Sequence, residues 1–305
     1  MRNVLERLSP GARVAVIRLR SLGDCVLTTP AISLLKRARP DLRIVTVVED
    51  AFASVFTGNP DLELVLAPSA SEISRWRPEL ILNLHGGVTS VRLLIAARSQ
   101  WRAGFSHFRF RRAYNIQIPR AQEILHVDRK VHTAEHIASA MFFLGVPHSE
   151  IPRARLFAQP RPSSRPYAVL HPRASAPDKT WPVSNFLAVA QHLEKRLSIE
   201  PIFIAGPGED LAAFAEYRAF AGAPLEEIKS LLSGASLFVG NDSGPAHMAA
   251  AFGLPVIVLF GSSDPDIWRP WRTESYVLTN AAGIHAIGAV EVGQAIEAVL
   301  ATQSR

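Results

Sequence analysis

The stretch from Leu237 to Gly261 constrains the fold more than any other part of the chain, because it reads as one strand–turn–helix–strand unit. A short apolar run over 237–239 ends at Gly240, and a helical stretch follows over 246–252. The next apolar run, 255–260, has the β-branched content of a strand that is buried on both faces. The polar residues Asn241, Asp242 and Ser243 all lie in the turn. We therefore expect a βαβ unit in a parallel sheet.

The turn inside this unit is a candidate anion site. Pro245 suits the first turn of a helix, and either Asp242 or Ser243 is placed to cap the amide groups there. Those amides and the positive end of the helix dipole attract an anion such as a diphosphate. Capped helices also follow strands in many α/β proteins that bind nothing at that point. The turn by itself leaves a purely structural role open.

Alternating strand and helix patterns continue on both sides of this unit. In the first half, strands are expected over 13–18, 43–48, 62–66, 79–84 and, as the last and shorter one, 101–105, with helices over 27–35, 51–56, 88–97 and 132–144. In the second half, strands are expected over 167–171, 201–205 and 276–278, with helices over 184–197, 208–218, 225–232 and 289–301. Pro30 should kink the first helix or mark an irregular turn in it.

A Pro- and Ser-rich stretch over 159–166 has no apolar periodicity and is the predicted linker. It would join an N-terminal domain of residues 1–158 to a C-terminal domain of residues 167–305 with a closing helix. Two α/β domains of this kind, each built on a parallel sheet, would leave a cleft between them.

Composition narrows the function classes. Of the 305 residues 48% are apolar, so two packed cores are available, and the single cysteine, Cys25, excludes an internal disulfide or a cysteine metal cluster. We expect no signal peptide, because the apolar run over 14–17 is short and is followed by Arg18, and no apolar run has the length of a membrane span. The cytosol is the expected compartment.

The net charge of +6 is unevenly distributed. The segment 98–120 contains six arginines and no Asp, Glu or Lys, and aromatic residues are interspersed among them. Such a segment suits nucleic acid, an anionic membrane surface or a phosphorylated substrate, and it also suits a solvated face. The arginines are Arg98, Arg102, Arg109, Arg111, Arg112 and Arg120.

Two loops beyond strand ends contain further candidate site residues. Asp24 follows the first strand, at the edge where open α/β sheets bind ligands, although it would also serve as a helix cap. Lys179 follows the first strand of the second domain and is one of only five lysines. It would neutralise a phosphate, or it is an ordinary surface lysine.

Four motifs occur in order along the chain: Ser-Leu-Gly-Asp at 21–24, His-Pro-Arg-Ala-Ser with Lys-Thr-Trp-Pro at 171–182, Gly-Pro-Gly-Glu at 206–209, and Gly-Asn-Asp-Ser-Gly-Pro-Ala-His at 240–247. Together they resemble glycosyltransferase family 9, the ADP-heptose:lipopolysaccharide heptosyltransferases, over nearly the whole chain. The resemblance implies two Rossmann-like domains that face a cleft (the GT-B architecture), with the acceptor on the first domain and the sugar nucleotide on the second.

The resemblance also implies roles for individual residues. Asp24 would be the general base, and Asp242 would bind the donor sugar. Lys179 and the hydroxyl of Ser175 would hold the diphosphate, and Glu209 would contact the ribose. The phosphate-binding turn would be shaped by Ser243, Gly244 and His247, although His247 has a plain alternative as a buried helix residue.

The expected reaction is an inverting, metal-independent transfer of a heptose, with ADP-heptose as the expected donor and a lipopolysaccharide core as acceptor. We expect no cofactor, no bound metal and no nucleic-acid partner. The partners would be a nucleotide-sugar donor and a phosphorylated glycolipid acceptor held by Arg109, Arg111 and Arg112. A cytoplasmic enzyme of this kind would contact the anionic inner membrane transiently.

Competing readings are a dehydrogenase, a serine hydrolase and a non-catalytic protein. The first turn lacks the G-x-G-x-x-G of a nicotinamide dehydrogenase, and no G-x-S-x-G occurs. A non-catalytic sugar-nucleotide-binding protein of the same fold, or a family member with another sugar or acceptor, stays open. Two departures from the family pattern are Asn83, where an acidic residue is frequent, and a short segment over 206–224.

Overall fold

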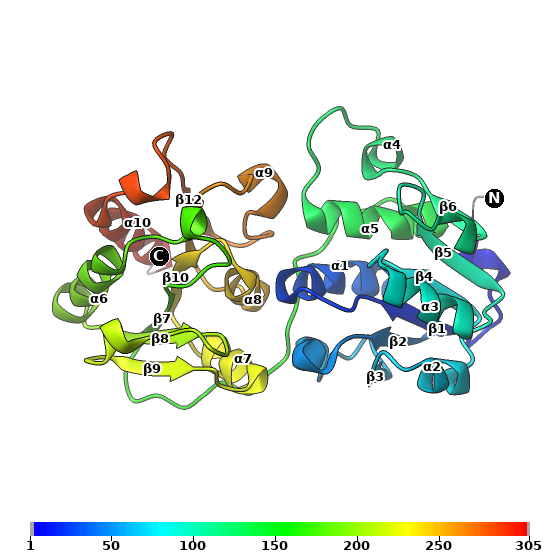
Figure 1. Cartoon of the computed structure of the whole chain (residues 1–305), viewed down its shortest axis with the longest axis horizontal. Coiled ribbons are helices and arrows are strands. Elements are labelled where there is room, and N and C mark those ends of the chain that lie inside the picture. The colour runs from blue at the N-terminus through cyan, green and yellow to red at the C-terminus, as the bar shows by residue number, and fades with distance from the viewer. Residues whose placement is uncertain (1–2, 304–305) are drawn as a thin grey trace. The chain divides into compact units, whose positions relative to one another are not determined.

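A computed structural model describes residues 3–303 and divides the chain into two compact units, Met1–Arg155 and Leu156–Arg305 (Figure 1). Each unit has its own parallel β-sheet with helices packed on it. The predicted α/β class, with the two Rossmann-like domains of the GT-B architecture, is confirmed. Within residues 3–303, no helix is both long and apolar enough to cross a bilayer.

The first unit is built on a six-stranded sheet of order β3-β2-β1-β4-β5-β6. Its strands are β1 (Arg13–Ile17), β2 (Arg43–Val47), β3 (Leu64–Leu66), β4 (Leu80–Asn83), β5 (Trp101–Phe105) and β6 (Ile116–Ile118). Its α-helices are α1 (Leu22–Ala38), α2 (Ala70–Trp76), α3 (Val88–Ala96), α4 (Ala121–Leu125) and α5 (Thr133–Leu144). Short 3-10 turns are η1 (Leu5–Arg7), η2 (Asp50–Val55) and η3 (Arg111–Ala113).

The strand order places the helices of this unit in two layers. The chain moves one way from β1 to β2 to β3 and then crosses back to β4 and β5. Because such crossovers are right-handed, α1 lies on one face of the sheet, and α2 and α3 lie on the other. Ile73 of α2 and Leu94 of α3 accordingly share a buried cluster with Ala15, Ile17 and Val45.

Helix α1 is continuous through Pro30, so Pro30 does not mark an irregular turn, and the kink stays a prediction. Pro30 has no N–H to donate to the carbonyl of Val26, four residues earlier. The hydroxyl of Thr29 donates to that carbonyl instead, at 2.9 Å. The helix therefore keeps this buried carbonyl satisfied without the backbone bond.

The second unit is built on a six-stranded sheet of order β12-β11-β10-β7-β8-β9. Its strands are β7 (Tyr167–His171), β8 (Glu200–Ala205), β9 (Arg218–Ala221), β10 (Leu237–Asn241), β11 (Val256–Leu259) and β12 (Ser275–Leu278). Its α-helices are α6 (Val183–Leu197), α7 (Leu225–Ser233), α8 (Gly244–Phe252), α9 (Pro265–Trp268) and α10 (Ala289–Gln303). Short 3-10 turns are η4 (Pro177–Lys179), η5 (Ala212–Phe214) and η6 (Ile284–Ala286).

The predicted βαβ unit forms the centre of this second sheet. Strand β10 pairs in parallel with β11, with Phe238 opposite Val256, and it pairs on its other side with β7. Both strands are buried along their whole length, as their apolar sequences predict. Trp181 is fully buried beside them, where its indole N–H donates to the carbonyl of Ile287 at 2.9 Å.

Several elements differ from the predictions. Strand β6 lies beyond β5, so 101–105 is not the last strand of the first unit, and α2, α4 and α9 were not predicted. The expected helix over 208–218 is wrong, because that segment holds only η5 and the start of β9. Strand β9 lies at the sheet edge and is mostly exposed, and its apolar run over 219–221 has only three residues.

The boundary between the units falls at 155/156, before the predicted linker over 159–166. The beginning of that stretch is held against α7 of the second unit. The side chain of Arg161 pairs with Glu227 at 2.8 Å, and the hydroxyl of Ser230 donates to the carbonyl of Gln159 at 2.7 Å. These contacts explain why 159–161 belong to the second unit.

Candidate active site

Each sheet reverses its strand order at one place, between β1 and β4 in the first unit and between β7 and β10 in the second. In open α/β sheets, ligands bind beyond the carboxyl ends of the strands at such a reversal. Asp24 and His85 follow β1 and β4, and Asp242 follows β10, while His171 ends β7. The motifs found in the sequence therefore lie at the two places where the topology favours ligand binding.

The Asp24 carboxylate belongs to the first turn of α1. Its Oδ2 accepts hydrogen bonds from the hydroxyl of Ser21 at 3.1 Å and from the Ser21 backbone N–H at 3.5 Å. Its Oδ1 lies 3.4 Å from Nη1 of Arg18, and 24% of the Asp24 side chain stays exposed. The interpretation of Asp24 as a helix cap is thus confirmed. The predicted role as general base stays a prediction, and the exposed part of the carboxylate would have to serve it.

Arg18 forms an ion pair with Asp24, and no pattern in the sequence marks this arginine as a site residue. It is 8% exposed, and its Nε has no hydrogen-bond partner among the described residues. Burial lowers the pKa of Arg18, although the Asp24 carboxylate opposes this effect. A buried guanidinium with an unused donor beside Asp24 is a ready partner for an anionic group.

Two histidines lie within electrostatic reach of Asp24. Burial lowers the pKa of His85, and the charges of Arg18 and Arg20 add to that effect. Burial likewise lowers the pKa of His136 to about 4, with its ring stacked on Phe105 at a centroid distance of 4.2 Å. Both imidazoles are therefore neutral near pH 7, and Asp24 raises the pKa of each. The position of His85 just beyond a strand end was a signal that the sequence analysis did not use.

Asn83, one of the two departures from the family pattern, is fully buried at the end of β4. Its Nδ2 donates to the hydroxyls of Ser90, at 3.1 Å, and Tyr114, at 2.9 Å. Its Oδ1 accepts from the backbone N–H groups of His85, at 3.0 Å, and Gly86, at 3.1 Å. The amide therefore fixes the turn that carries His85.

A cavity of about 870 Å³ opens near the carboxyl ends of β5 and β6. It is lined by three cations, Arg120, Arg129 and Lys130, by two histidines and by two carboxylates. Arg129 is held by Glu135 through two hydrogen bonds of 2.7 and 2.9 Å. The other lining residues are His107, Gln122, Glu123, Asp128 and His136. Asp24 does not line this cavity, although its charge acts on the pKa of His136, which does.

The six arginines over 98–120 do not form one surface. Arg102 is structural, because its guanidinium donates to the carbonyls of Ala113, at 3.1 Å, and Ser99, at 3.0 Å. The three predicted acceptor-binding residues, Arg109, Arg111 and Arg112, are exposed but do not line the cavity of about 870 Å³. The guanidinium of Arg109 lies 5.6 Å from the ring centroid of Phe110.

The second unit brings His171, Ser243 and Asp242 together at its reversal point. The hydroxyl of Ser243 donates to the carbonyl of Asn241 at 3.1 Å and lies 3.0 Å from Nδ1 of His171. Ser243 therefore does not cap α8 with its side chain, and that expectation was wrong. Burial lowers the pKa of His171 to about 4, so this imidazole is neutral near pH 7.

Asp242 and Lys179 are near enough to interact. Burial raises the pKa of Asp242, while the Ser263 hydroxyl and the Lys179 ammonium oppose that shift. Lys179 ends the turn η4, and Gly261 allows this turn to approach, because a Cβ at Gly261 would clash with the carbonyl oxygen of Asp178. Ser175 lies exposed in the same loop.

The remaining residues predicted to contact the donor are Glu209, Gly244 and His247. Glu209 Oε2 accepts a 2.6 Å hydrogen bond from the backbone N–H of Gly206 and lies 3.9 Å from His171 Nε2. Gly244 begins α8 and is partly exposed. His247 is 4% exposed and packs near Trp268, so the plain interpretation as a buried helix residue is confirmed.

We expect a reaction without metal, but the chain contains one Asp-x-Asp sequence, Asp264-Pro265-Asp266, and a carboxylate pair of this kind holds a divalent metal in some glycosyltransferases. Asp264 caps α9 by accepting from the backbone N–H of Asp266 at 2.9 Å, and Asp266 pairs with Arg269 at 2.8 Å. Across residues 3–303, no group of three or more His, Cys, Asp or Glu residues is arranged to hold a metal ion. Both carboxylates thus have structural partners within α9.

Comparison with known proteins agrees with these features. The model of the family "Glycosyltransferase family 9 (heptosyltransferase)" matches residues 71–286. A lipopolysaccharide heptosyltransferase 3 from Escherichia coli is 28% identical over 288 residues, covering 83% of this chain and 84% of that protein. The crystal structure of a family 9 glycosyltransferase from Veillonella parvula has a TM-score of 0.84 at 21% identity, covering 95% of this chain and 97% of that one.

The structure of ADP-heptose lps heptosyltransferase II from E. coli is also similar, with a TM-score of 0.82 at 18% identity, and it covers 96% of this chain and 100% of that one. The structural likenesses concern the fold, and the family match covers both units. With its four motifs at the carboxyl edges of two Rossmann-like sheets, this chain belongs to glycosyltransferase family 9 and is a glycosyltransferase.

Proposed function

We propose that this enzyme transfers a heptose from ADP-heptose to a lipopolysaccharide core acceptor, with inversion and without a metal. The observation that carries this proposal is the placement of Asp242 directly after β10, at the reversal point of the second sheet, with the Lys179 charge close enough to oppose the rise of its pKa. A cation for the diphosphate and a carboxylate for the sugar are the two groups that a sugar nucleotide needs. The names of the similar heptosyltransferases support the choice of heptose, ADP and lipopolysaccharide.

On the donor side, Lys179 and the first amides of α8 would stabilise the charge that builds on the leaving diphosphate. No side chain caps those amides, because the Ser243 hydroxyl is engaged with Asn241 and His171. Of these amides, that of Ala246 donates to the Ser243 carbonyl at 3.1 Å and Pro245 has none, so the Gly244 N–H is the one that would meet the diphosphate. Asp242 would accept hydrogen bonds from sugar hydroxyls, since a carboxylate repels a diphosphate. Ser175 and Glu209 would complete the contacts to phosphate and ribose.

On the acceptor side, an acidic sugar or phosphate would bind in the cavity that Arg120, Lys130 and His136 line. The charge of Arg18, whose side chain is 10% exposed, would attract a second anionic group close to Asp24. Arg109, Arg111 and Arg112 would contribute long-range attraction from the exposed surface. In this proposal the residues of the cavity contact the acceptor directly, and the exposed arginines attract it from a distance.

In the reaction, the acceptor hydroxyl would attack the anomeric carbon as the bond to the diphosphate breaks. Asp24 would take the hydroxyl proton, a contribution of about 10² to 10⁴-fold. Attack opposite to the leaving group inverts the anomeric centre. We propose that no metal takes part, because the Lys179 charge and the α8 amides would do the work of a cation, and EDTA treatment should then leave the rate unchanged. The site of the reaction would be the cytoplasmic face of the inner membrane.

The test is to measure nucleoside diphosphate release from a panel of ADP-, UDP- and GDP-sugars, with and without a lipopolysaccharide core acceptor. We expect release from ADP-heptose that depends on the acceptor. Binding of ADP-heptose without acceptor-dependent release would instead support the alternative, a non-catalytic sugar-nucleotide-binding protein. Turnover of another sugar nucleotide would keep the reaction type and correct the donor.

A further inference from the structure

Helix α3 carries apolar side chains on a surface where apolar groups are uncommon. Within residues 3–303 only five large apolar side chains are counted as exposed, and two of them, Val88 at 49% and Ile95 at 57%, belong to this helix. Arg92 is exposed between them. Positions 88, 92 and 95 are spaced by four and three residues, so they form one outward stripe. The inner side of α3, with Val91 and Leu94, packs on the sheet.

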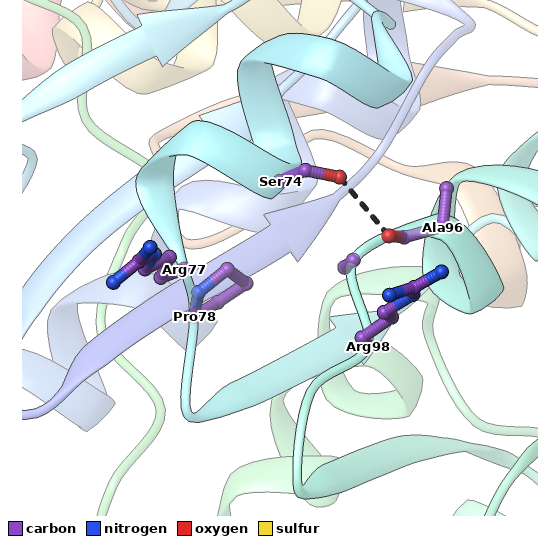
Figure 2. A pocket seen from close by; sticks show the side chains of 6 residues that line it. Ser74, Arg77, Pro78, Ala96 and Arg98 are labelled. Carbon is purple, nitrogen blue, oxygen red and sulfur yellow. Dashed lines mark hydrogen bonds between the residues drawn. The ribbon is translucent and has the colours of Figure 1, made fainter.

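A basic cavity lies at the end of this stripe. It has a volume of about 570 Å³, and Arg77 and Arg98 lie on its two sides (Figure 2). Both arginines are exposed and have left-handed backbone conformations, with φ of 52° and 49°, directly after α2 and close after α3. The hydroxyl of Ser74 donates to the carbonyl of Ala96 at 3.0 Å and ties the two helices together at the cavity, which both residues line (Figure 2).

The charge of this surface is one-sided. Arg75, Arg77, Arg92 and Arg98 lie on it, whereas the segment 70–98, which holds both helices, contains two acidic residues, Glu72 and Glu79. A carboxylate oxygen of Glu79 accepts from the backbone N–H of Ser9 at 3.2 Å, so this carboxylate already has a hydrogen-bond partner. Arginines around exposed aliphatic side chains are the composition of helices that lie in the interface of an anionic bilayer.

We propose that the outer surface of α2 and α3 docks on an anionic lipid membrane. Val88 and Ile95 enter the headgroup layer, and Arg77 and Arg98 hold a lipid phosphate in the cavity between them. Arginine suits this task because its guanidinium grips phosphate through two parallel hydrogen bonds. The proposed partner is lipid because the surface is basic and because the apolar side chains of Val88 and Ile95 lie on the same helix as Arg92, next to the cavity of Arg77 and Arg98.

The direction of α3 would keep the candidate base close to the membrane in this docked state. Since β4 and β5 are parallel, the helix between them runs back from the carboxyl edge to the amino edge of the sheet. Val88 therefore lies next to the turn that carries His85, and Asp24 at the same edge would stay beside the membrane surface. The usefulness for a lipid-linked acceptor rests on the proposed function, whereas membrane binding is measured without any turnover.

The test is co-sedimentation of the full chain with vesicles of phosphatidylglycerol and phosphatidylcholine, and with phosphatidylcholine alone, at low and high salt. We expect binding to the anionic vesicles only, and less of it at high salt. The double variant Arg77→Gln/Arg98→Gln should bind at least about tenfold more weakly. Ile95→Ser should weaken binding severalfold at both salt concentrations, because the apolar contribution is not screened.

Matched controls keep the result specific. Arg37→Gln/Arg196→Gln removes the same charge from exposed positions elsewhere, and Val290→Ser removes the most exposed large apolar side chain, at 77%. Both should bind as wild type does, and thermal melting of every variant should show that it is folded. The proposal is overturned if wild type does not bind anionic vesicles, if it binds neutral ones equally, or if the control double variant loses as much affinity as Arg77→Gln/Arg98→Gln.

Discussion

At the scale of single residues, Asn83 shows how a departure from a family pattern acquires a physical meaning. Its side-chain amide makes four hydrogen bonds in a fully buried position, two as donor and two as acceptor. A carboxylate at this place would accept from the same two backbone amides but would donate nothing. Asn83 is therefore a positioning residue for the turn of His85, and its amide nitrogen lets the Ser90 and Tyr114 oxygens act as acceptors.

Asn83→Ala should lower the free energy of unfolding by about 2 to 4 kcal/mol, because it leaves buried backbone N–H groups without acceptors. Urea titration followed by circular dichroism measures this loss. The exposed Gln100→Ala serves as the control and should change the free energy by less than about 0.5 kcal/mol. An Asn83→Ala protein as stable as this control would show that the network contributes nothing.

The buried His171 predicts a specific acid sensitivity. Because its pKa is about 4 in the folded state and near 6.5 when unfolded, the unfolded state binds more protons between these values. Stability should therefore fall as the pH drops from about 6.5 to 4. His136, also at about 4, acts in the same direction. Carboxylates with lowered pKa values, such as Glu63 and Glu135, act only below about pH 4.5.

Urea titrations of wild type and His171→Gln at pH 7.5, 6 and 5 measure this effect. Wild type should lose about 1 to 2 kcal/mol more than the variant between pH 7.5 and 5. Equal losses in the two proteins would mean that His171 does not carry the acid sensitivity.

At the scale of elements, long apolar strands and well-patterned helices were predictable from sequence, and short or exposed ones were not. Strand β10 and helix α6 have clear patterns and lie within two residues of their expected bounds. Strand β6 alternates Ile-Gln-Ile over only three residues, and the apolar run of β9, 219–221, is equally short, so neither pattern is long enough to mark a strand. Their places are set by pairing with β5 and β8, which no local pattern reveals.

The candidate site, like the secondary structure, was predictable only where short motifs follow well-patterned strands. Asp24, Lys179 and Asp242 belong to short motifs at strand ends, where the fold class alone favours ligand binding. The cavity around Arg120, Lys130 and His136 was not predictable, because three separate segments create it. The division of the arginine-rich segment was not predictable either. Arg102 donates to backbone carbonyls, whereas nothing in its local sequence distinguishes it from the exposed arginines.

The loops around η4 and α8 carry the donor-side prediction. Lys179→Ala should reduce turnover about a hundredfold with a smaller loss of ADP affinity, because its charge matters most when the diphosphate leaves. Asp242→Ala should weaken binding of ADP-heptose more than binding of ADP, since its partner is the sugar. Calorimetry with both ligands, together with initial rates, measures these effects. Unchanged affinity and turnover in Lys179→Ala would remove Lys179 from the site.

The acceptor side divides between the cavity and the exposed arginines. Arg120→Gln/Lys130→Gln should raise the acceptor KM at every salt concentration, by about tenfold or more, because the contact is direct. Arg109→Gln/Arg111→Gln/Arg112→Gln should raise it only at low salt, where steering is unscreened. Donor affinity should stay unchanged in both variants. A triple variant that is impaired at high salt would move direct contact to the exposed segment.

At the scale of the whole molecule, the proposed chemistry needs both units. The candidate base and the basic cavity belong to the first unit, and the groups for the diphosphate and the sugar belong to the second. Each unit has its own buried apolar cluster, so each holds its own candidate residues in place. Binding of the donor should therefore be separable from proton transfer by substitutions in one unit.

The most direct test of this account is the rate of ADP release from ADP-heptose by Asp24→Asn at saturating acceptor, measured beside the calorimetric affinity for the donor. Asparagine keeps an oxygen that accepts from Ser21 but does not take a proton at neutral pH. The account predicts a fall in turnover of at least about a hundredfold with donor affinity unchanged. Turnover close to that of wild type in a folded Asp24→Asn protein would contradict it and leave Asp24 as the cap of α1.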